Sequence, residues 1–283
     1  MVDAIYQLIK KTGENKNQKA KVELKNDNLA TKGVPDGEKA IYFPRSNDLG
    51  VLLLHSYTST PYEFYDLAKY LADKNITAYA PTIAGHGTSP NDLAKTTISD
   101  WQKSAEDAYL FLKQQCRKVF VVGSSFGGNL AFHLATKFTN PLAGVVSLGT
   151  PIKVRFEKMF LLGIYSYGWF KKNQKKRRAD YKLMYLDQEQ VVYPVMPVPS
   201  LRRFFHFIKK ITIPSLKAIK TPTLIIQSSA DKIVNPKSAK YLHEHLGSKD
   251  KRILWVNGSH HALAVNDKRG LIYRAIYRFI AGS

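Results

Sequence analysis

Cysteine, acidic residues and long apolar runs are all scarce in this 283-residue chain. The single Cys116 excludes an intramolecular disulfide, which fits a reducing compartment without requiring one. No stretch approaches the roughly 18 consecutive apolar residues that a membrane-spanning helix needs. Residues 1–11 lack the apolar core and the small-residue cleavage site of a signal peptide. We therefore expect a cytoplasmic protein, with peripheral attachment at the membrane as the alternative.

Acidic side chains are outnumbered, because 22 Asp and Glu oppose 43 Lys and Arg and leave a net charge of +21. The excess is concentrated in residues 151–220, which hold 16 Lys or Arg and 4 Asp or Glu. Within them an apolar and aromatic run, 159–170, directly precedes a basic run, 171–178. A basic surface with aromatic neighbours is typical of proteins that rest on anionic membranes. The alternatives are a solvated face on a segment packed by its own aromatics, and nucleic-acid binding, for which no accompanying motif is present.

Motifs that hold a metal or an organic cofactor are also missing. The HExxH, CxxC and phosphate-binding P-loop patterns do not occur anywhere in the sequence. We therefore expect a reaction carried by side chains and backbone alone, with neither cofactor nor metal.

Apolar strands alternate with helical patterns on both sides of the basic segment. Strands are predicted at 40–43, 51–55, 76–80, 119–122, 144–148, 223–227 and 252–256. Helices are predicted at 61–71, 99–115, 129–137, 236–246 and 267–281, with Thr60 capping the first and Ser99 beginning the second. This alternation favours right-handed crossovers and a mostly parallel sheet with helices on both faces, which is an α/β fold.

A pause in this pattern divides the chain into four parts. Residues 1–38 form a polar extension, with one alternating run at 20–25 that suits a short edge strand. Residues 39–150 and 216–283 form the two parts of the α/β core. Residues 151–215 form a helical insertion that has the length and charge of a cap or lid.

The strand at 119–122 ends in Gly123-Ser124-Ser125-Phe126-Gly127, which fits a nucleophile elbow between a strand and a helix. Glycines two residues before and after the serine leave room for neighbouring backbone. Ser125 is therefore the candidate nucleophile. Because GxSxG also occurs by chance, this assignment requires a base and an orienting acid elsewhere in the chain.

Two later loops contain candidates for those partners. Asp231 follows the strand at 223–227, where its carboxylate can orient a histidine. The alternative for Asp231 is a loop carboxylate that caps the next helix. His260 and His261 follow the last predicted strand, and only one of them can face Ser125.

Further motifs make the resemblance to a known family specific. They are Leu54-His55-Ser56-Tyr57-Thr58, Ala80-Pro81-x-x-x-Gly85-His86-Gly87, Asp100-Trp101, the elbow, 222–227 with Asp231 and Asn235-Pro236, and Ser259-x-His261. With these motifs, residues 50–280 resemble the α/β-hydrolase superfamily, and within it the small bacterial carboxylesterases and monoacylglycerol lipases with a minimal cap. The resemblance implies an α/β-hydrolase fold, in which the triad follows the chain order serine, acid, histidine.

The resemblance also implies roles for individual residues. His261 matches the histidine of the family's Ser-x-His motif and would be the catalytic base, with His260 as the fallback. The backbone N–H groups of Tyr57 and Phe126 match the family's oxyanion hole. His86, a second glycine-flanked histidine, is expected to be structural.

Ser56 departs from the family, which usually has glycine at this position. If the turn needs a positive φ, Ser56 is strained or displaces the Tyr57 amide. If the turn does not need it, the Ser56 hydroxyl can add a donor to the oxyanion hole.

The implied function is a serine carboxylic-ester hydrolase that acts on short- to medium-chain acyl esters through an acyl-enzyme. Its expected partner is a small-molecule acyl ester. Thioesters and peptides stay open as substrates, because leaving-group preference depends on the pocket rather than on the triad. The alternative function is a membrane- or polyanion-binding protein on a hydrolase scaffold with weak or no turnover.

Overall fold

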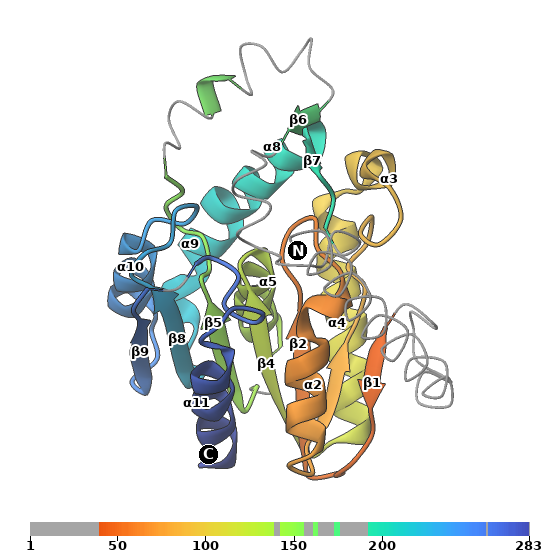
Figure 1. The fold of residues 1–283 in the computed structure, drawn as a ribbon, viewed down its shortest axis with the longest axis vertical. Coiled ribbons are helices and arrows are strands. Elements are labelled where there is room, and N and C mark those ends of the chain that lie inside the picture. The colour runs from red at the N-terminus through yellow and green to blue at the C-terminus, as the bar shows by residue number, and fades with distance from the viewer. Residues whose placement is uncertain are drawn as a thin grey trace, which may run out of the picture.

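A seven-stranded sheet in the order β1-β3-β2-β4-β5-β8-β9 forms the centre of the molecule (Figure 1). The computed structural model describes residues 40–138, 142–155, 161–163, 173–175, 192–258 and 260–282. The strands are β1 (Ile41–Phe43), β2 (Leu49–Leu54), β3 (Thr77–Ala80), β4 (Lys118–Ser124), β5 (Gly144–Leu148), β8 (Thr223–Ser228) and β9 (Lys251–Val256). Every neighbouring pair is parallel except β1 with β3. The predicted mostly parallel sheet is confirmed, while the edge strand predicted at 20–25 lies outside the described residues.

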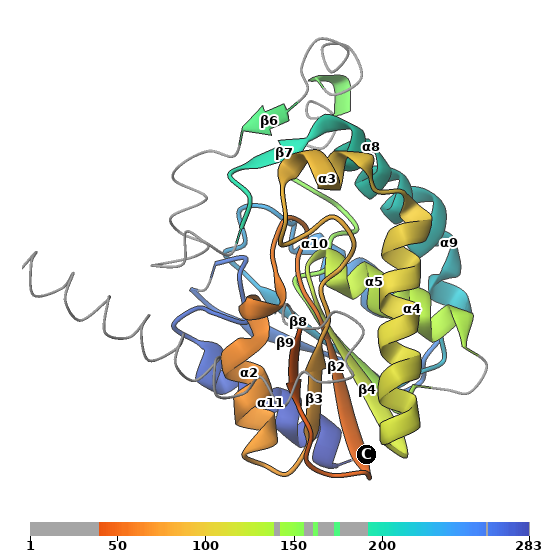
Figure 2. The same cartoon turned by 90° about the vertical axis from the view of Figure 1, so that its right-hand side faces the viewer.

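Helices cover both faces of this sheet (Figures 1 and 2). One apolar cluster joins the sheet to α4 (Ile98–Gln115), α5 (Phe126–Lys137) and α10 (Lys237–His245). A second cluster joins the opposite face to α2 (Tyr65–Ala72) and α11 (Arg269–Ala281). Strand β2 is apolar on both faces of the sheet, because Leu52 and Leu54 belong to the first cluster and Val51 and Leu53 to the second.

Local sequence determines where two of these helices begin. Thr97 caps α4, because its side chain accepts from the Asp100 N–H while the Asp100 carboxylate accepts from the Thr97 N–H at 2.7 Å. This capping box starts the helix before the predicted Ser99. The prediction for Thr60 was wrong, since its side chain makes no capping hydrogen bond and Pro61 opens a 3-10 turn, η3 (Pro61–Phe64), that leads into α2.

The described part of the predicted insertion contains strands as well as helices. Its elements are β6 (Asn173–Lys175), β7 (Val195–Pro197), α8 (Val198–His206), the π-helical segment η4 (Phe207–Thr212) and α9 (Ile213–Ser215), and the 3-10 turn η5 (Leu216–Ala218) follows it directly. Strands β6 and β7 pair antiparallel, and the sequence did not predict them. Nor did it predict α3 (Pro90–Lys95), which contacts both β7 and α8. Among the described residues, none of the helices combines the length and hydropathy needed to cross a bilayer.

The insertion packs onto the core through apolar side chains rather than standing apart from it. Leu201, Phe204 and Phe207 belong to the same buried cluster as Trp101 of α4 and Phe126 of α5. The ring centroids of Phe126 and Phe207 are 5.3 Å apart. The elements α8, η4, α9 and η5 follow one another without a break over residues 198–218, and η4 and α9 contact α5. The division of the chain at residue 215 stays a prediction.

Helix α5 approaches β2 and β4 so closely that side chains are excluded at two positions. A Cβ on Gly127 would overlap the carbonyl oxygen of Leu54, and a Cβ on Gly123 would overlap the carbonyl oxygen of Gly127. Main-chain atoms cannot move aside as a flexible side chain can. Glycine is therefore required at both positions if α5 is to start directly from β4.

Replacing Gly127 with alanine is expected to destabilise the protein by about 1–3 kcal/mol, because the added methyl group forces β2 and α5 apart. Urea unfolding followed by circular dichroism measures the effect. Gly270→Ala is the matched control, since its added Cβ would meet only the Arg274 Nη1 at 3.7 Å. Equal stability changes in the two variants would contradict this account of the elbow.

Candidate active site

The candidate site lies at the edge of the sheet where the parallel strands end. Gly123 of β4 pairs with Leu54 of β2, and Ser228 of β8 pairs with Val256 of β9. Carboxyl ends of parallel strands meet at one edge, so the loops that follow them converge there. These loops contain all the residues that the sequence predicts for the site.

Ser125 occupies a strained turn between β4 and α5. Its backbone has φ 48° and ψ −115°, which is rare for a residue with a side chain. Its N–H donates to the Leu148 carbonyl at 2.7 Å, and its own carbonyl accepts from the Gly128 N–H at 2.9 Å. Because α5 begins at the next residue, the positive end of the helix dipole lies beside the serine.

Asp231 and His261 form a hydrogen-bonded pair. The Asp231 Oδ2 lies 2.7 Å from the His261 Nδ1, and the two residues are 0% and 6% exposed. The Asp231 Oδ1 accepts from the backbone N–H groups of Ile233 at 2.8 Å and Val234 at 2.9 Å. Gln227 completes the set by donating from Nε2 to Oδ2 at 3.1 Å. The aspartate is therefore held in one orientation by four donors.

This pairing fixes the hydrogen-bonding roles of the histidine. A carboxylate can only accept, so the His261 Nδ1 carries a proton and Nε2 is left as the acceptor. Gly149 lies between the histidine and the elbow. A Cβ on Gly149 would lie 3.4 Å from the His261 Nδ1. The carbonyl of the preceding residue, Leu148, accepts from the Ser125 N–H. The structure thus brings His261, rather than His260, to Asp231.

Burial and pairing act in opposite directions on these two groups. Burial alone would raise the pKa of Asp231, but the charge of His261 and hydrogen bonds from His261 and two backbone N–H groups hold it below its usual range. Burial alone would lower the pKa of His261, but the charge and hydrogen bond of Asp231, with the charge of Glu63, hold it above its ordinary value. The pair therefore favours an ionised Asp231 and a His261 with a raised pKa.

Two backbone amides beside the serine have no acceptor in the part of the chain that the structure describes. Among the described residues, neither the Tyr57 N–H nor the Phe126 N–H makes a hydrogen bond. Phe126 is the first residue of α5, where an amide has no partner within the helix. The Tyr57 ring packs edge-on against the Phe126 ring, with centroids 6.2 Å apart. Two unpaired amides near a serine are what binding of an oxyanion requires.

The backbone of residues 55–60, which we call the oxyanion loop, shows whether Ser56 is strained. The non-glycine residue with positive φ in this loop is Thr58, at 67°, so Ser56 is not strained. Its hydroxyl donates to the Glu63 Oε1 at 2.8 Å, and its N–H donates to the Glu63 Oε2 at 2.9 Å. The hydroxyl is therefore occupied by Glu63, which contradicts the alternative that it serves as a further oxyanion donor.

Two buried histidines, His55 and His86, make hydrogen bonds at the loop at 83–86 beside the oxyanion loop. The His55 Nε2 accepts from the Ile83 N–H at 3.1 Å, and its Nδ1 lies 2.9 Å from the Ser56 carbonyl. Burial first, and then the charge of His86, lower the pKa of His55 to about 3, so His55 is neutral and donates from Nδ1. The His86 Nδ1 lies 3.1 Å from the carbonyls of Ile83 and Ala84. Both imidazoles are thus engaged in holding the loop at 83–86.

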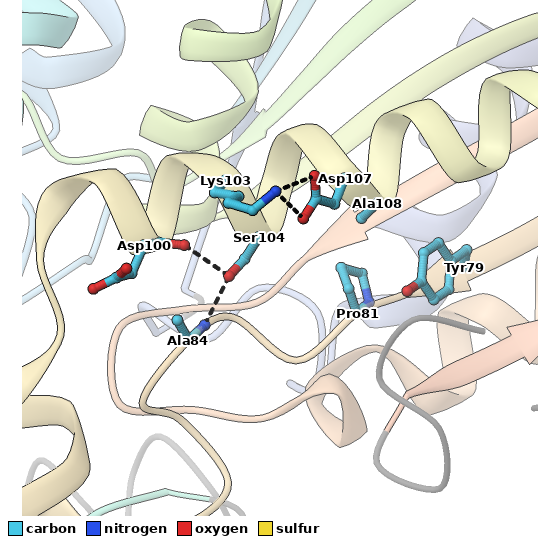
Figure 3. Close-up of a pocket in the computed structure, with 8 residues that line it drawn as sticks. All are labelled: Tyr79, Pro81, Ala84, Asp100, Lys103, Ser104, Asp107 and Ala108. Carbon is cyan, nitrogen blue, oxygen red and sulfur yellow. Dashed lines mark hydrogen bonds and ion pairs between the residues drawn. The ribbon is translucent and has the colours of Figure 1, made fainter.

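A pocket that includes Ala84 of that same loop is shown in Figure 3. It is lined by Tyr79, Pro81, Ala84, Asp100, Lys103, Ser104, Asp107 and Ala108. The Ser104 hydroxyl accepts from the Ala84 N–H at 3.1 Å and donates to the Asp100 carbonyl at 2.8 Å (Figure 3). The hydrogen bonds of Ser104 therefore connect the loop at 83–86 to α4. In the described part of the chain, no group of three or more His, Cys, Asp or Glu could hold a metal ion.

Residues of the insertion reach the oxyanion loop from the other side. The Tyr57 hydroxyl lies 2.7 Å from the Ser200 Oγ, which donates to the Pro197 carbonyl at 3.0 Å. The Tyr193 N–H donates to the Thr58 carbonyl at 2.9 Å. These contacts were not predicted, because nothing in the sequence around 193–200 indicates a partner more than 130 residues earlier. Gln227, by contrast, was visible as a polar residue at the end of an apolar strand.

Comparisons with known proteins show what the chain is similar to. Residues 46–269 match the family model described as serine aminopeptidase, S33. The chain is 27% identical to a carboxylesterase of Bacillus subtilis (strain 168) over 83% of its length and 94% of that protein. It is 28% identical to a thermostable monoacylglycerol lipase of Bacillus sp. (strain H-257) over 85% and 93%.

A solved structure shows the same fold. It belongs to work on LipS and LipT, two metagenome-derived lipolytic enzymes, and superimposes with a TM-score of 0.79 at 27% identity, covering 88% of this chain and 99% of the other. The predicted α/β-hydrolase fold is thereby confirmed.

We expect His261 to titrate with a midpoint above the ordinary value of about 6.5 in an NMR pH titration, because Asp231 and Glu63 stabilise its cation. Asp231→Asn removes the nearest negative charge, so the His261 pKa should fall below its wild-type value. His55 should not titrate between about pH 5 and 9, because burial keeps it neutral. Asp267→Asn, at an exposed carboxylate, is the matched control, and the same His261 midpoint in the wild type and Asp231→Asn would contradict the pairing.

Proposed function

The chain belongs to the serine aminopeptidase S33 family, and from this premise we propose that it hydrolyses carboxylic esters through an acyl-enzyme on Ser125. It is a carboxylesterase- or monoacylglycerol lipase-like α/β hydrolase. The observation that carries the proposal is the hydrogen bond of 2.7 Å between Asp231 and His261, in loops that converge on the strained serine.

The proposed mechanism assigns one step to each group. The Ser125 hydroxyl attacks the ester carbonyl carbon as the His261 Nε2 takes its proton, while the Tyr57 and Phe126 amides bind the oxyanion. The intermediate collapses, the bond to the alkoxy group breaks, and His261 returns the proton to the departing alcohol. Water then attacks the acyl-enzyme by the same route and releases the carboxylic acid. Asp231 orients the imidazole and stabilises its cation throughout.

The surroundings of the serine favour esters over free amino termini. Among the described residues, the only buried carboxylates are Asp231 and Glu63, and both are already hydrogen-bonded. An aminopeptidase substrate would need an unpaired anion for its α-ammonium group. Aromatic side chains instead surround the oxyanion loop, with Tyr57, Phe126 and Phe204 in mutual ring contact. Apolar surroundings of this kind suit an acyl chain, and we propose short to medium lengths.

The basic segment supports a second proposal, contact with an anionic membrane surface. Lys209, Lys210, Lys217 and Lys220 are exposed along and just after η4, α9 and η5. The aromatic residues Phe204, Phe205 and Phe207 of the same segment are buried, so they do not form an interfacial belt. We therefore propose a weak contact that depends on charge and decreases with salt.

Ser125→Ala should lower the hydrolysis of p-nitrophenyl butyrate by at least about 10³-fold, because the nucleophile is lost. His261→Ala should have a comparable effect, whereas His260→Ala should stay near the wild-type rate. A fluorophosphonate should label wild-type Ser125, and the matched p-nitroanilide should react far more slowly than the ester. An unchanged rate in Ser125→Ala would contradict the proposed nucleophile, and a preference for the anilide would contradict the ester assignment.

Lys209→Gln/Lys210→Gln should weaken binding to vesicles containing anionic phosphatidylglycerol by about tenfold or more, since each cation near the surface contributes about 1 kcal/mol. Co-sedimentation at low and high salt measures it. Lys74→Gln/Lys249→Gln is the matched control, because it removes two exposed cations that directly precede β3 and β9, at the amino ends of those strands. Equal loss in both double variants would overturn a localised surface, and salt-independent binding would overturn the electrostatic account.

A further inference from the structure

Glu63 is a buried carboxylate directly after the oxyanion loop. It lies in η3 and is 1% exposed. Its Oε2 accepts from the Ser56 N–H at 2.9 Å and its Oε1 accepts from the Ser56 hydroxyl at 2.8 Å. Both carboxylate oxygens are thus used on a single residue, which immediately precedes Tyr57.

Burial of this charge is costly and only partly compensated. A buried carboxylate is unfavourable unless hydrogen bonds or opposite charges offset its loss of water. In the described part of the chain, no Lys, Arg or His forms an ion pair with Glu63. The two bonds from Ser56 are its compensation. An apolar side chain would fill the position at lower cost, so the carboxylate is best explained by what it does to Ser56.

Ser56 connects Glu63 to the nucleophile elbow. Its Oγ lies 3.0 Å from the Oγ of Ser124, the last residue of β4 and the one before Ser125. A hydroxyl has one proton, so the Ser56 O–H lies between two acceptors, the Glu63 Oε1 and the Ser124 Oγ. A buried chain of hydrogen bonds therefore joins the residue before Tyr57 to the residue before Ser125.

We propose that Glu63 is a positioning residue for the ester hydrolysis proposed above. Through Ser56 and Ser124, it holds the Tyr57 amide and the Phe126 amide in fixed relation, so that both reach the same oxyanion. The oxyanion exists only in the transition state and the intermediates that resemble it. Loss of this alignment should therefore lower kcat while KM changes little.

The Glu63 charge adds an effect that a purely structural role would lack. The charged groups that act on His261 are Asp231, from the loop after β8, and Glu63, from η3, and both raise its pKa. Tyr273 of α11 stays neutral, because burial first, and then the charges of Asp66 and Glu63, raise the pKa of its hydroxyl. Removal of the Glu63 charge should consequently lower the pKa of His261 and move the acidic limb of kcat/KM to lower pH.

Three variants separate alignment from charge. Glu63→Ala leaves two buried Ser56 donors without an acceptor and should lower kcat by about 10²-fold. Ser56→Ala keeps the charge and cuts the link to Ser124, so kcat should fall about tenfold with the acidic limb unmoved. Glu63→Gln keeps a hydrogen-bonding group and removes the charge. It should lower kcat less than Glu63→Ala and retain at pH 5.5 a larger fraction of its activity at pH 8 than the wild type does.

The matched control is Asp66→Asn, an exposed carboxylate one turn later in α2, which should leave both kcat and the pH profile unchanged. Thermal unfolding accompanies each assay, so that a variant that fails to fold is replaced by the next in the series. Wild-type kcat in folded Ser56→Ala and Glu63→Gln, with an unmoved acidic limb, would overturn the proposal. Failure of the ester hydrolase assignment would look different, because the wild type itself would then be no more active than Ser125→Ala.

Discussion

The approach of α5 to the end of β2 is the constraint on which the site depends. Only glycine at position 127 allows the helix to pass the Leu54 carbonyl, and only glycine at 123 allows the chain to turn from β4 into that helix. The turn holds Ser125 at φ 48° and places the first amide of α5 beside it. Strain in the serine backbone, estimated at about 1–3 kcal/mol, is sustained by packing that leaves the backbone no alternative.

Sequence could predict the parts of the site that depend on local pattern and chain order. An apolar strand followed by GxSxG marks the turn at Ser125, and the strands at 223–227 and 252–256 predict the loops that contain Asp231 and His261. The structure places the Asp231 Oδ2 2.7 Å from the His261 Nδ1, whereas the catalytic roles of the two residues stay proposals. The mostly parallel sheet followed from the alternation of strands and helices, whereas its strand order was not predicted.

Contacts between distant segments could not be predicted in this way. The sequence suggested aromatic rings of the basic segment at a membrane, yet Phe204, Phe205 and Phe207 are buried, and the rings of Phe204 and Phe207 contact that of Phe126. Most of the aromatic run at 159–170 lies outside the described residues. Ser56 looked like a departure from glycine that would either strain the loop or add a donor. It does neither, because the Ser56 hydroxyl donates to Glu63. Glu63 lies seven positions later, in a 3-10 turn where the sequence predicted a helix.

The oxyanion loop is consequently held from two sides by groups of different origin. Glu63 binds Ser56 from within the core, while Ser200 and Tyr193 of the insertion bind the Tyr57 hydroxyl and the Thr58 carbonyl. The backbone of Tyr57 lies between these two contacts. Burial raises the pKa of the Tyr57 side-chain hydroxyl, so this hydroxyl keeps its proton and can donate. The insertion, for which we propose the role of a cap, thus also holds the Tyr57 side of the proposed oxyanion hole. We therefore expect changes in the insertion to affect the chemical step as well as substrate binding, because the same contacts serve both.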